Sequence, residues 1–417
     1  MTERILSTLS ALGIGVYTIN AVTTASAELF SLRKGTEDMR RFKRIQNFAV
    51  TVYRDFDEYR GSSGVLLSPG MSDDELTEKL KSAYENAQYV KNPFFELPEP
   101  TVQPVAEKPE AELWQAAESM RAALDAADVN ADSFVNSAEI FAESTYTRIL
   151  TSRGTDVSYS VLNCKGEFVV QCREPMDVEM YQAFDYLSAD TESLTKLASE
   201  ALATVRDRAR AVTAPAAGQY DIILAGEQLA ELMSMYPEKA DVSMVFAHYS
   251  QYKAGMQVQG EDVKGEKLNI KLYSQAPYSD DGIPMPEREL IKDGELKQLH
   301  GATRFCRYLG IEPVGSYKCM KVDNGTMPLA EMRKGKVLMP VAFSDFQMDA
   351  LRGSFAGEIR LAYLYEDGKV ALLTGGSVNG SLTEKQSDLR FSLERFSNAS
   401  YSGPYAVLIP SVNVSGK

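Results

Sequence analysis

The chain has 417 residues, more than one hydrophobic core usually serves, so its length predicts two domains. Hydrophobic residues make up 44% of the sequence and charged residues 24%, a balance typical of globular proteins and not of disordered chains. The net charge is −14 and the isoelectric point is about 4.9. Such a surface repels phosphate backbones, so we expect no nucleic-acid binding. No apolar run approaches the ~20 residues of a membrane span, so we expect no membrane insertion.

The first residues could be mistaken for a targeting segment. Residues 5–19 are apolar and are followed by Ala25-Ser26-Ala27, which imitates a signal peptide with its cleavage site. Polar residues interrupt the apolar run, and the acidic and basic side chains before it cancel. We therefore predict a short amphipathic helix over Glu3–Leu12 and then a strand from Gly15.

The rest of the first half predicts strands combined with helices. β-branched and aromatic residues indicate strands within 15–53. Ser72 and the acids after it indicate the start of a helix that extends to Val90, and five prolines in 92–109 indicate a surface linker. The other predicted elements are helices over 110–127 and 190–211 and strands over 134–144, 147–162 and 166–171.

The sequence changes character after Ala211–Gly218. We place an N-terminal mixed α/β domain at 1–212 and a β-rich C-terminal domain at 218–417. The second begins with a strand over 220–225 and a short helix over 226–236. Turn sequences between apolar runs then predict hairpins, so we expect an α+β protein whose C-terminal domain is a mostly antiparallel sheet or barrel. The four turns are at 281–282, 293–294, 323–325 and 367–368.

Few side chains are suited to metal or nucleophilic chemistry. The only histidines, His248 and His300, are isolated, whereas a zinc peptidase needs several clustered ligands and a carboxylate base. Gly375–Gly380 resembles a serine nucleophile elbow but has Asn379 where the second glycine should be, so a glycine-rich turn is the better interpretation.

The four cysteines, far apart in the sequence, predict reduced thiols in a cytoplasmic protein. A disulfide between Cys164 and Cys172 across a hairpin is compatible with the sequence but not required. The other two cysteines are Cys306 and Cys319.

Several sequence motifs resemble those of the TldD/TldE (PmbA) family, the "modulator of DNA gyrase" proteins. Asp281–Lys297 is similar to the family's D-x-G-x-P turn and the I-x-x-G-x-L-K strand after it. Gly353–Val370 resembles its G-S-x-x-G-E-I … A-Y-x-I-E-x-G-K block, and Gly375–Gly380 occupies its G-A-T-L-I-G position. The N-terminal half matches only in the order of its elements, so residues 218–417 carry the specific part of the resemblance.

The resemblance also indicates which kind of subunit this is. TldD-like chains bind the catalytic zinc through His-Glu-x-x-x-His and a cysteine near the C-terminus, whereas TldE-like chains lack this set and pair with TldD. Here Glu231 and Tyr236 occupy the histidine positions, Leu232 replaces the glutamate base, and the tail 403–417 has no cysteine. The resemblance therefore implies a TldE-like chain with no catalytic residues and no metal or cofactor of its own, with zinc in a TldD-like partner.

The implied function is that of a non-catalytic, cytoplasmic subunit that pairs with a zinc metallopeptidase in the proteolysis of short or unfolded peptides. Alone, such a chain would form a homodimer that imitates the heterodimer, and its sheet edges would hold peptide by strand addition. Two alternatives remain open. One is a divergent metallopeptidase with a metal site rebuilt from His248, Glu231 and acids of the sheet, and the other is a peptide-binding protein without a peptidase partner.

Overall fold

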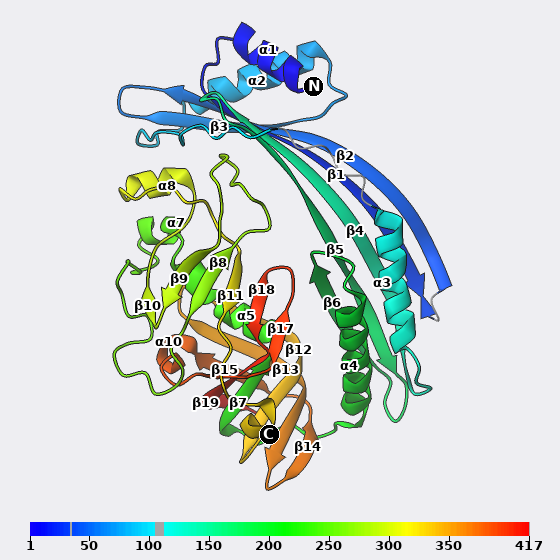
Figure 1. The fold of residues 1–417 in the computed structure, drawn as a ribbon. Coiled ribbons are helices and arrows are strands. Elements are labelled where there is room, and N and C mark those ends of the chain that lie inside the picture. Colours follow the sequence, from blue (N-terminus) through cyan, green and yellow to red (C-terminus); the bar gives the residue numbers. More distant parts are fainter. Residues whose placement is uncertain (34–35, 105–111, 417) are drawn as a thin grey trace.

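A computed structural model describes residues 1–33, 36–104 and 112–416 (Figure 1). Its helices are α1 (Thr2–Ala11), α2 (Asp73–Ala87), α3 (Leu113–Ala127), α4 (Thr191–Arg210), α5 (Glu227–Met233), α6 (Met235–Lys239), α7 (Val242–Phe246), α8 (Thr303–Tyr308), α9 (Leu329–Met332) and α10 (Leu382–Lys385). The strands of the N-terminal half are β1 (Tyr17–Leu32), β2 (Thr36–Asp55), β3 (Arg60–Leu67), β4 (Ser133–Thr151), β5 (Asp156–Cys172) and β6 (Val178–Tyr186). Those of the C-terminal half are β7 (Gly218–Ala225), β8 (Ile270–Tyr273), β9 (Arg288–Lys292), β10 (Glu295–Leu296), β11 (Cys319–Val322), β12 (Val337–Asp349), β13 (Ser354–Glu366), β14 (Lys369–Leu373), β15 (Ser377–Ser381), β16 (Arg390–Phe391), β17 (Arg395–Ser397), β18 (Tyr401–Pro404) and β19 (Ala406–Ser415).

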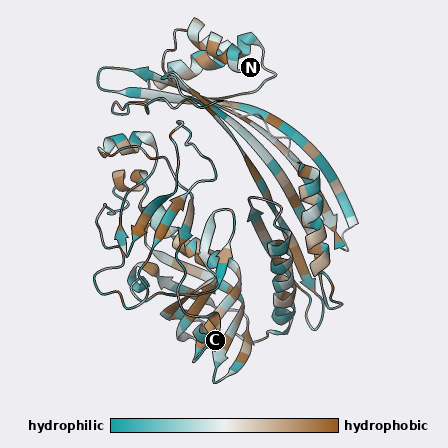
Figure 2. Cartoon of the chain, viewed as in Figure 1, coloured by the Kyte–Doolittle hydropathy of each residue, from teal (hydrophilic) through white to brown (hydrophobic). Residues whose placement is uncertain are grey.

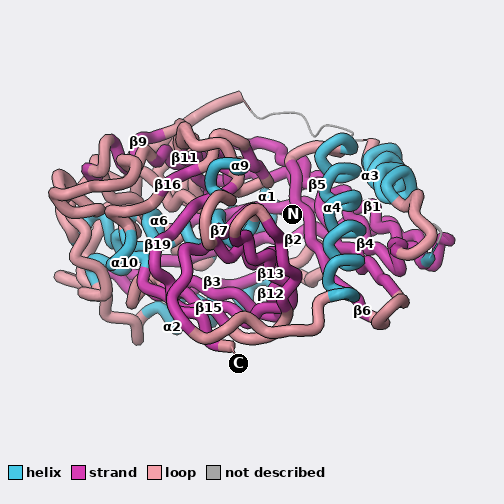
Figure 3. The backbone as a smooth tube through the Cα atoms, turned by 90° about the horizontal axis from the view of Figure 1, so that it is seen from below, coloured by secondary structure: helices cyan, strands magenta, loops and turns pink. Residues whose placement is uncertain are grey.

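The N-terminal half is built on one antiparallel sheet in the order β3-β2-β1-β4-β5-β6. Its four longest strands have 16 to 20 residues, and Figure 1 shows them as a long curved ribbon. α3 and α4 lie side by side against it (Figure 3), where Leu29, Ile140 and Phe168 pack with apolar residues of both helices. Strand β6 forms the free edge of this sheet beside α4, which makes it important for the site described below.

The other end of the curved sheet is covered by α1 and α2. Leu9 of α1 and Leu76 and Leu80 of α2 pack on Ile19 and Val50 of the strands. α2 begins at a capping box in which Ser72 accepts a hydrogen bond from the Glu75 N–H and Glu75 accepts one from the Ser72 N–H. The predicted helix start at Ser72 is therefore confirmed.

The C-terminal half contains two further sheets within the described residues. One has the order β10-β9-β8-β11-β18-β17, and the other has the order β12-β7-β19-β15-β13-β14. β12 also pairs with β13, which closes β12, β7, β19, β15 and β13 into a ring. The largest apolar cluster of the chain packs between these sheets and α5 and α6, and Figure 2 shows several of their strands as strongly hydrophobic. The predicted α+β class with a sheet-rich, mostly antiparallel C-terminal part is confirmed.

Several predicted elements differ from the structure. β4 and β5 are long, and the turn between them lies at 152–155, so the predicted break at 145–146 is wrong. Cys164 and Cys172 lie on the same strand, β5, and are both free, so the hairpin imagined between them is also wrong. β6 was not predicted, because its apolar and charged residues alternate only partly.

The turns and the short helix of the C-terminal half were predicted with mixed success. The turns at 293–294 and 367–368 are hairpins, and both residues of each have positive φ, as the Asp-Gly sequences require. At 281–282 the turn joins only an isolated bridge, and 323–325 leads to no hairpin because β11 pairs with β8 and β18 instead. The helix predicted over 226–236 is interrupted at Ser234.

The segment between α2 and α3 is only partly described. Phe95 and Leu97 are buried and pack against Tyr53, so the first part of the predicted linker 92–109 is held to the sheet. Residues 105–109 of that linker, and the predicted helix start at Glu110, lie outside the described residues. No helix in the described part of the chain is long and apolar enough to cross a membrane.

The two halves meet in two separate regions. In the first, Tyr308 of α8 donates a hydrogen bond to the Pro93 carbonyl at 2.9 Å. In the second, Tyr363 of β13 donates to Asp207 of α4 at 2.7 Å, and the Ala399 N–H donates to the Asp185 carbonyl of β6 at 2.8 Å. This second region surrounds a cavity of about 380 Å³.

Candidate functional site

The altered zinc-motif positions lie on the two short helices that follow β7. Glu231 is exposed, and its carboxylate accepts a hydrogen bond from the Met348 N–H of β12 at 3.2 Å. Partial burial raises the pKa of Glu231, and the nearby Asp345 and other acids add to this effect. A single carboxylate in an acidic neighbourhood attracts cations but provides only one ligand.

Leu232 and Tyr236 belong to the hydrophobic core. Both are fully buried, and the Tyr236 hydroxyl donates to Gln386 at 3.3 Å. Burial raises the pKa of the Tyr236 phenol well above its usual value, so it is a poor metal ligand. Leu232 can neither bind a metal nor accept a proton. Of the three motif positions, only Glu231 is therefore accessible to solvent.

These residues do not fit a peptidase zinc ion. Such a site needs three protein ligands of nitrogen, sulfur or oxygen and a base next to the bound water. Within the described residues, no three His, Cys, Asp or Glu side chains are grouped to hold a metal. The described part of the tail, 403–416, contains no cysteine.

The two histidines have structural positions. His300 is buried, and its Nδ1 accepts a hydrogen bond from the Tyr317 N–H at 3.2 Å, while its Nε2 lies 3.0 Å from the Pro237 carbonyl. These contacts fit a neutral ring, and burial lowers its pKa. His248 occupies a backbone conformation with φ of 61° at the end of α7. Neither histidine joins Glu231 in a metal-binding group of the described chain.

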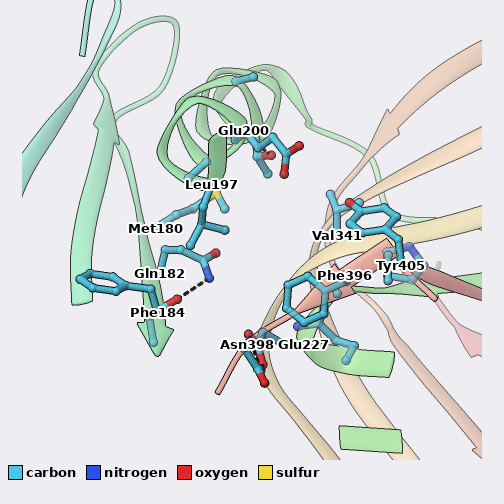
Figure 4. Close-up of a pocket in the computed structure, with 18 of the residues that line it drawn as sticks. Met180, Gln182, Phe184, Leu197, Glu200, Glu227, Val341, Phe396, Asn398 and Tyr405 are labelled. Atoms are coloured by element: carbon cyan, nitrogen blue, oxygen red, sulfur yellow. Dashed lines mark hydrogen bonds between the residues drawn. The ribbon is translucent and has the colours of Figure 1, made fainter. Parts of the chain in front are cut away.

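A cavity of about 380 Å³ lies between β6 and α4 on one side and the C-terminal sheets on the other (Figure 4). This volume is within the range of roughly 300–1,000 Å³ that is usual for ligand sites. Met180 and Leu197 contribute apolar surface from the N-terminal half, and Val341, Phe396 and Tyr405 face them from the C-terminal half. The cavity therefore exists only because the two halves pack together.

Three carboxylates also line this cavity: Glu227 at the start of α5, Asp185 of β6 and Glu200 of α4. The amide of Asn398 donates to both carboxylate oxygens of Glu227, at 3.1 and 2.9 Å. Surrounding protein raises the pKa of Glu227 by desolvation, and the charge of Asp185 raises it further. None of the three carboxylates forms a salt bridge with another described residue.

One cation, Arg333, also lines the cavity. Its guanidinium lies over the Tyr365 ring, 5.4 Å from the centroid, and it forms no salt bridge in the described part of the chain. The lining thus combines apolar walls with more negative than positive charge.

The sequence did not reveal this cavity. Its lining comes from segments as far apart as Met180 and Tyr405, so no local motif marks it. The one available signal was Glu227, an acidic residue directly after the strand that opens the C-terminal half. The predicted motif positions begin one helical turn later, at Glu231.

The fold matches solved structures over the whole chain. TldE from Thermococcus kodakarensis is similar with a TM-score of 0.78 and 15% identity, over 99% of this chain and 100% of that one. A candidate modulator of DNA gyrase from Bacteroides thetaiotaomicron gives a TM-score of 0.79 and 16% identity, over 100% and 99% of the two chains. A candidate modulator of DNA gyrase from Thermotoga maritima gives 0.78 and 16%, over 99% of each. These identities are low, so the likeness establishes the fold.

A match in sequence covers the second half. Residues 217–416 match the family model described as the PmbA/TldA metallopeptidase C-terminal domain, so this half is a domain of metallopeptidase-family type. No curated protein sequence matches the chain significantly. Together with the fold, the domain match confirms the resemblance to the TldD/TldE (PmbA) family that was noted in the sequence.

Proposed function

We propose that this chain is the non-catalytic, TldE-like subunit of a cytoplasmic peptidase. It pairs with a TldD-like chain that carries the zinc, and it helps to bind the short or unfolded peptides that the partner cleaves. The chain itself has no catalytic role in this scheme. Its four buried, free cysteines are compatible with a reducing compartment.

The observation that carries this proposal is the replacement and burial of residues at the zinc-motif positions. Leu232 and Tyr236 stand at the positions of the base and a ligand, and both are packed in the core. To restore a metal site there, the chain would have to repack its core as well as change its ligands. Meanwhile the fold around the motif has been kept, which favours a structural and binding role within a family complex.

The test is to co-express the chain with the nearest TldD-like protein, purify the complex, and assay cleavage of unfolded peptides by each chain alone and by both. We expect a stable complex with zinc in the partner, and cleavage that needs both chains. Recovery of the chain without any TldD-like partner, together with peptide binding, would instead support the stand-alone binding protein. Stoichiometric zinc in the isolated chain, with cleavage lost in Glu231→Ala, would support the divergent metallopeptidase and contradict our proposal.

A further inference from the structure

Strand β6 presents an unpaired backbone edge to the cavity. β6 is the last strand of its sheet and pairs only with β5 among the described strands. Three bonds show which groups point away from β5: the carbonyls of Glu179, Ala183 and Asp185 accept from Arg208, the Gln182 amide and the Ala399 N–H respectively. Alternate residues of a strand direct their backbone N–H and C=O groups to the same side, so the backbone groups of Tyr181 also point away from β5.

This edge is only lightly occupied. Of its outward carbonyls, that of Asp185 meets another backbone group, the Ala399 N–H at 2.8 Å. The carbonyl of Ala183 meets only the side chain of the neighbouring Gln182, at 3.0 Å, which an incoming chain could displace. An extended peptide could therefore continue the sheet from Ala399 along Ala183 and Tyr181, because strand addition needs only free main-chain groups.

The charges of the cavity indicate which part of a peptide fits. Glu227 and Asp185 lie where segment 397–399 meets β6, so negative charge collects at that end of the edge. Glu227 is held in place by Asn398 and has no basic partner in the described chain. A partly desolvated carboxylate of this kind gains most from a cation that also donates hydrogen bonds. A peptide's amino terminus provides both.

We propose that the cavity binds the amino-terminal residues of a peptide, extended antiparallel to β6, with the terminal ammonium on Glu227. The apolar surfaces of Met180, Leu197 and Phe396 then receive the first side chains. This inference rests on the proposed peptide-binding function and adds to it the groove, the direction of the peptide and the group recognised.

The test measures the fluorescence anisotropy of a hexapeptide of leucine, valine and serine, labelled at its C-terminus. It is added to the full chain, alone and in complex with the zinc-depleted partner. We expect N-acetylation of the peptide to weaken binding about tenfold, because it removes the ammonium. Glu227→Gln should weaken binding of the free-amine peptide equally, but not that of the acetylated peptide. The matched control is Glu78→Gln, at an exposed position of α2, which should change neither.

Backbone methylation tests strand addition without altering the protein. Only every second backbone N–H of an added strand faces β6. N-methylation of the peptide residues whose N–H groups face β6 should therefore abolish binding. N-methylation of the residues between them should change the affinity less than about twofold. Binding that ignores acetylation, Glu227→Gln and methylation overturns this inference but leaves peptide binding as the proposed function. Failure of the peptide to bind the chain or the complex overturns both.

Discussion

At the scale of single residues, α5 and α6 separate the motif positions into different environments. Glu231 remains in contact with solvent, whereas Leu232 and Tyr236 have no exposed surface. Two consecutive helices produce this separation, because neighbouring residues of a helix point in different directions. The different environments of the three motif positions thus follow from the packing of the core.

We predict that Leu232→Glu destabilises the protein strongly. The new carboxylate would lie in the core without a partner, which should lower the free energy of unfolding by about 3 kcal/mol or more. Urea unfolding would measure this. Glu231→Gln is the control and should change the free energy by less than about 1 kcal/mol, since the amide oxygen can still accept from Met348. A stable Leu232→Glu protein would show that α5 is not packed as described.

A second prediction concerns the pH dependence of peptide binding. Glu227 must be ionised to hold an ammonium, and its pKa is raised above the usual value, mainly by desolvation. Affinity should therefore fall as pH is lowered, beginning at a higher pH than for an ordinary carboxylate near about 4.3. The titratable and charged groups around Glu227 are Asp185 and Tyr186 of β6, Glu200 of α4, Glu231 one turn later on α5, and Arg333, which lines the same cavity.

Binding titrations from about pH 7 down to about pH 4 would test this prediction. The pKa of Asp185 is also raised, chiefly by desolvation. In Glu227→Gln, the affinity should therefore still fall as the pH is lowered, but by less than in the unchanged protein. If the affinity fell equally with decreasing pH in Glu227→Gln and in the unchanged protein, the role given to Glu227 would be contradicted.

At the scale of elements, the sequence predicted the helices of the N-terminal half well, but it missed the short helices α7 to α10 and placed the ends of the strands poorly. Ser72 and Asp190 cap α2 and α4 through bonds within three residues, so local sequence was enough to locate both helix starts. The break predicted near Tyr146 does not exist because β4 and β5 pair along their whole length. That pairing is a long-range interaction, and the β-propensity of neighbouring residues cannot predict it.

The candidate site, too, could be predicted from the sequence only in part. The motif positions on α5 and α6 could be found from the sequence because the whole motif spans six residues. The cavity could not, since β6, α4, α5 and β17 form it only after the two halves have packed. Desolvation and the charge of Asp185, which both depend on that packing, raise the pKa of Glu227.

Within β3, two glycines provide a third prediction. A Cβ at Gly61 would lie 1.8 Å from the carbonyl oxygen of Ala87, the last residue of α2, and 2.9 Å from that of Val90, three residues later. Neither can move without shifting the helix, so Gly61→Ala should cost about 2 kcal/mol of stability. Gly64, on the same strand, has no atom within 4 Å of such a Cβ, so Gly64→Ala should change stability by less than about 0.5 kcal/mol. Equal unfolding midpoints for the two variants would refute the close approach of α2 and β3.

At the scale of the whole molecule, the cavity depends on how the halves are held. Near the cavity they are joined by Tyr363 with Asp207 and by Ala399 with Asp185. The other contact region contains Phe95 of the N-terminal half against Tyr308 of the C-terminal half, and Asn20 of β1, which donates to the Asp280 carbonyl. The two regions lie apart, so together they resist rotation of one half against the other, which a single contact would permit.

The fourth prediction tests the aromatic region. The Tyr308 ring lies 6.1 Å from that of Phe95 and 5.2 Å from that of Phe246, and its hydroxyl donates to Pro93. Tyr308→Ala removes all of these contacts, so amide hydrogen exchange in residues 92–97 should accelerate by about tenfold or more.

Two further variants separate the ring from the hydroxyl. Tyr308→Phe keeps the aromatic packing and loses one hydrogen bond, worth about 1 kcal/mol, so its effect on exchange should be smaller. Tyr249→Ala removes a ring that is 65% exposed and should leave the exchange of residues 92–97 unchanged. If Tyr308→Ala also left it unchanged, Phe95 and its neighbours would be held by the N-terminal sheet alone. The halves would then be held by the contacts beside the cavity and by segment 278–280, where the Asp280 carbonyl accepts from Asn20 and the Tyr278 ring packs on Tyr159.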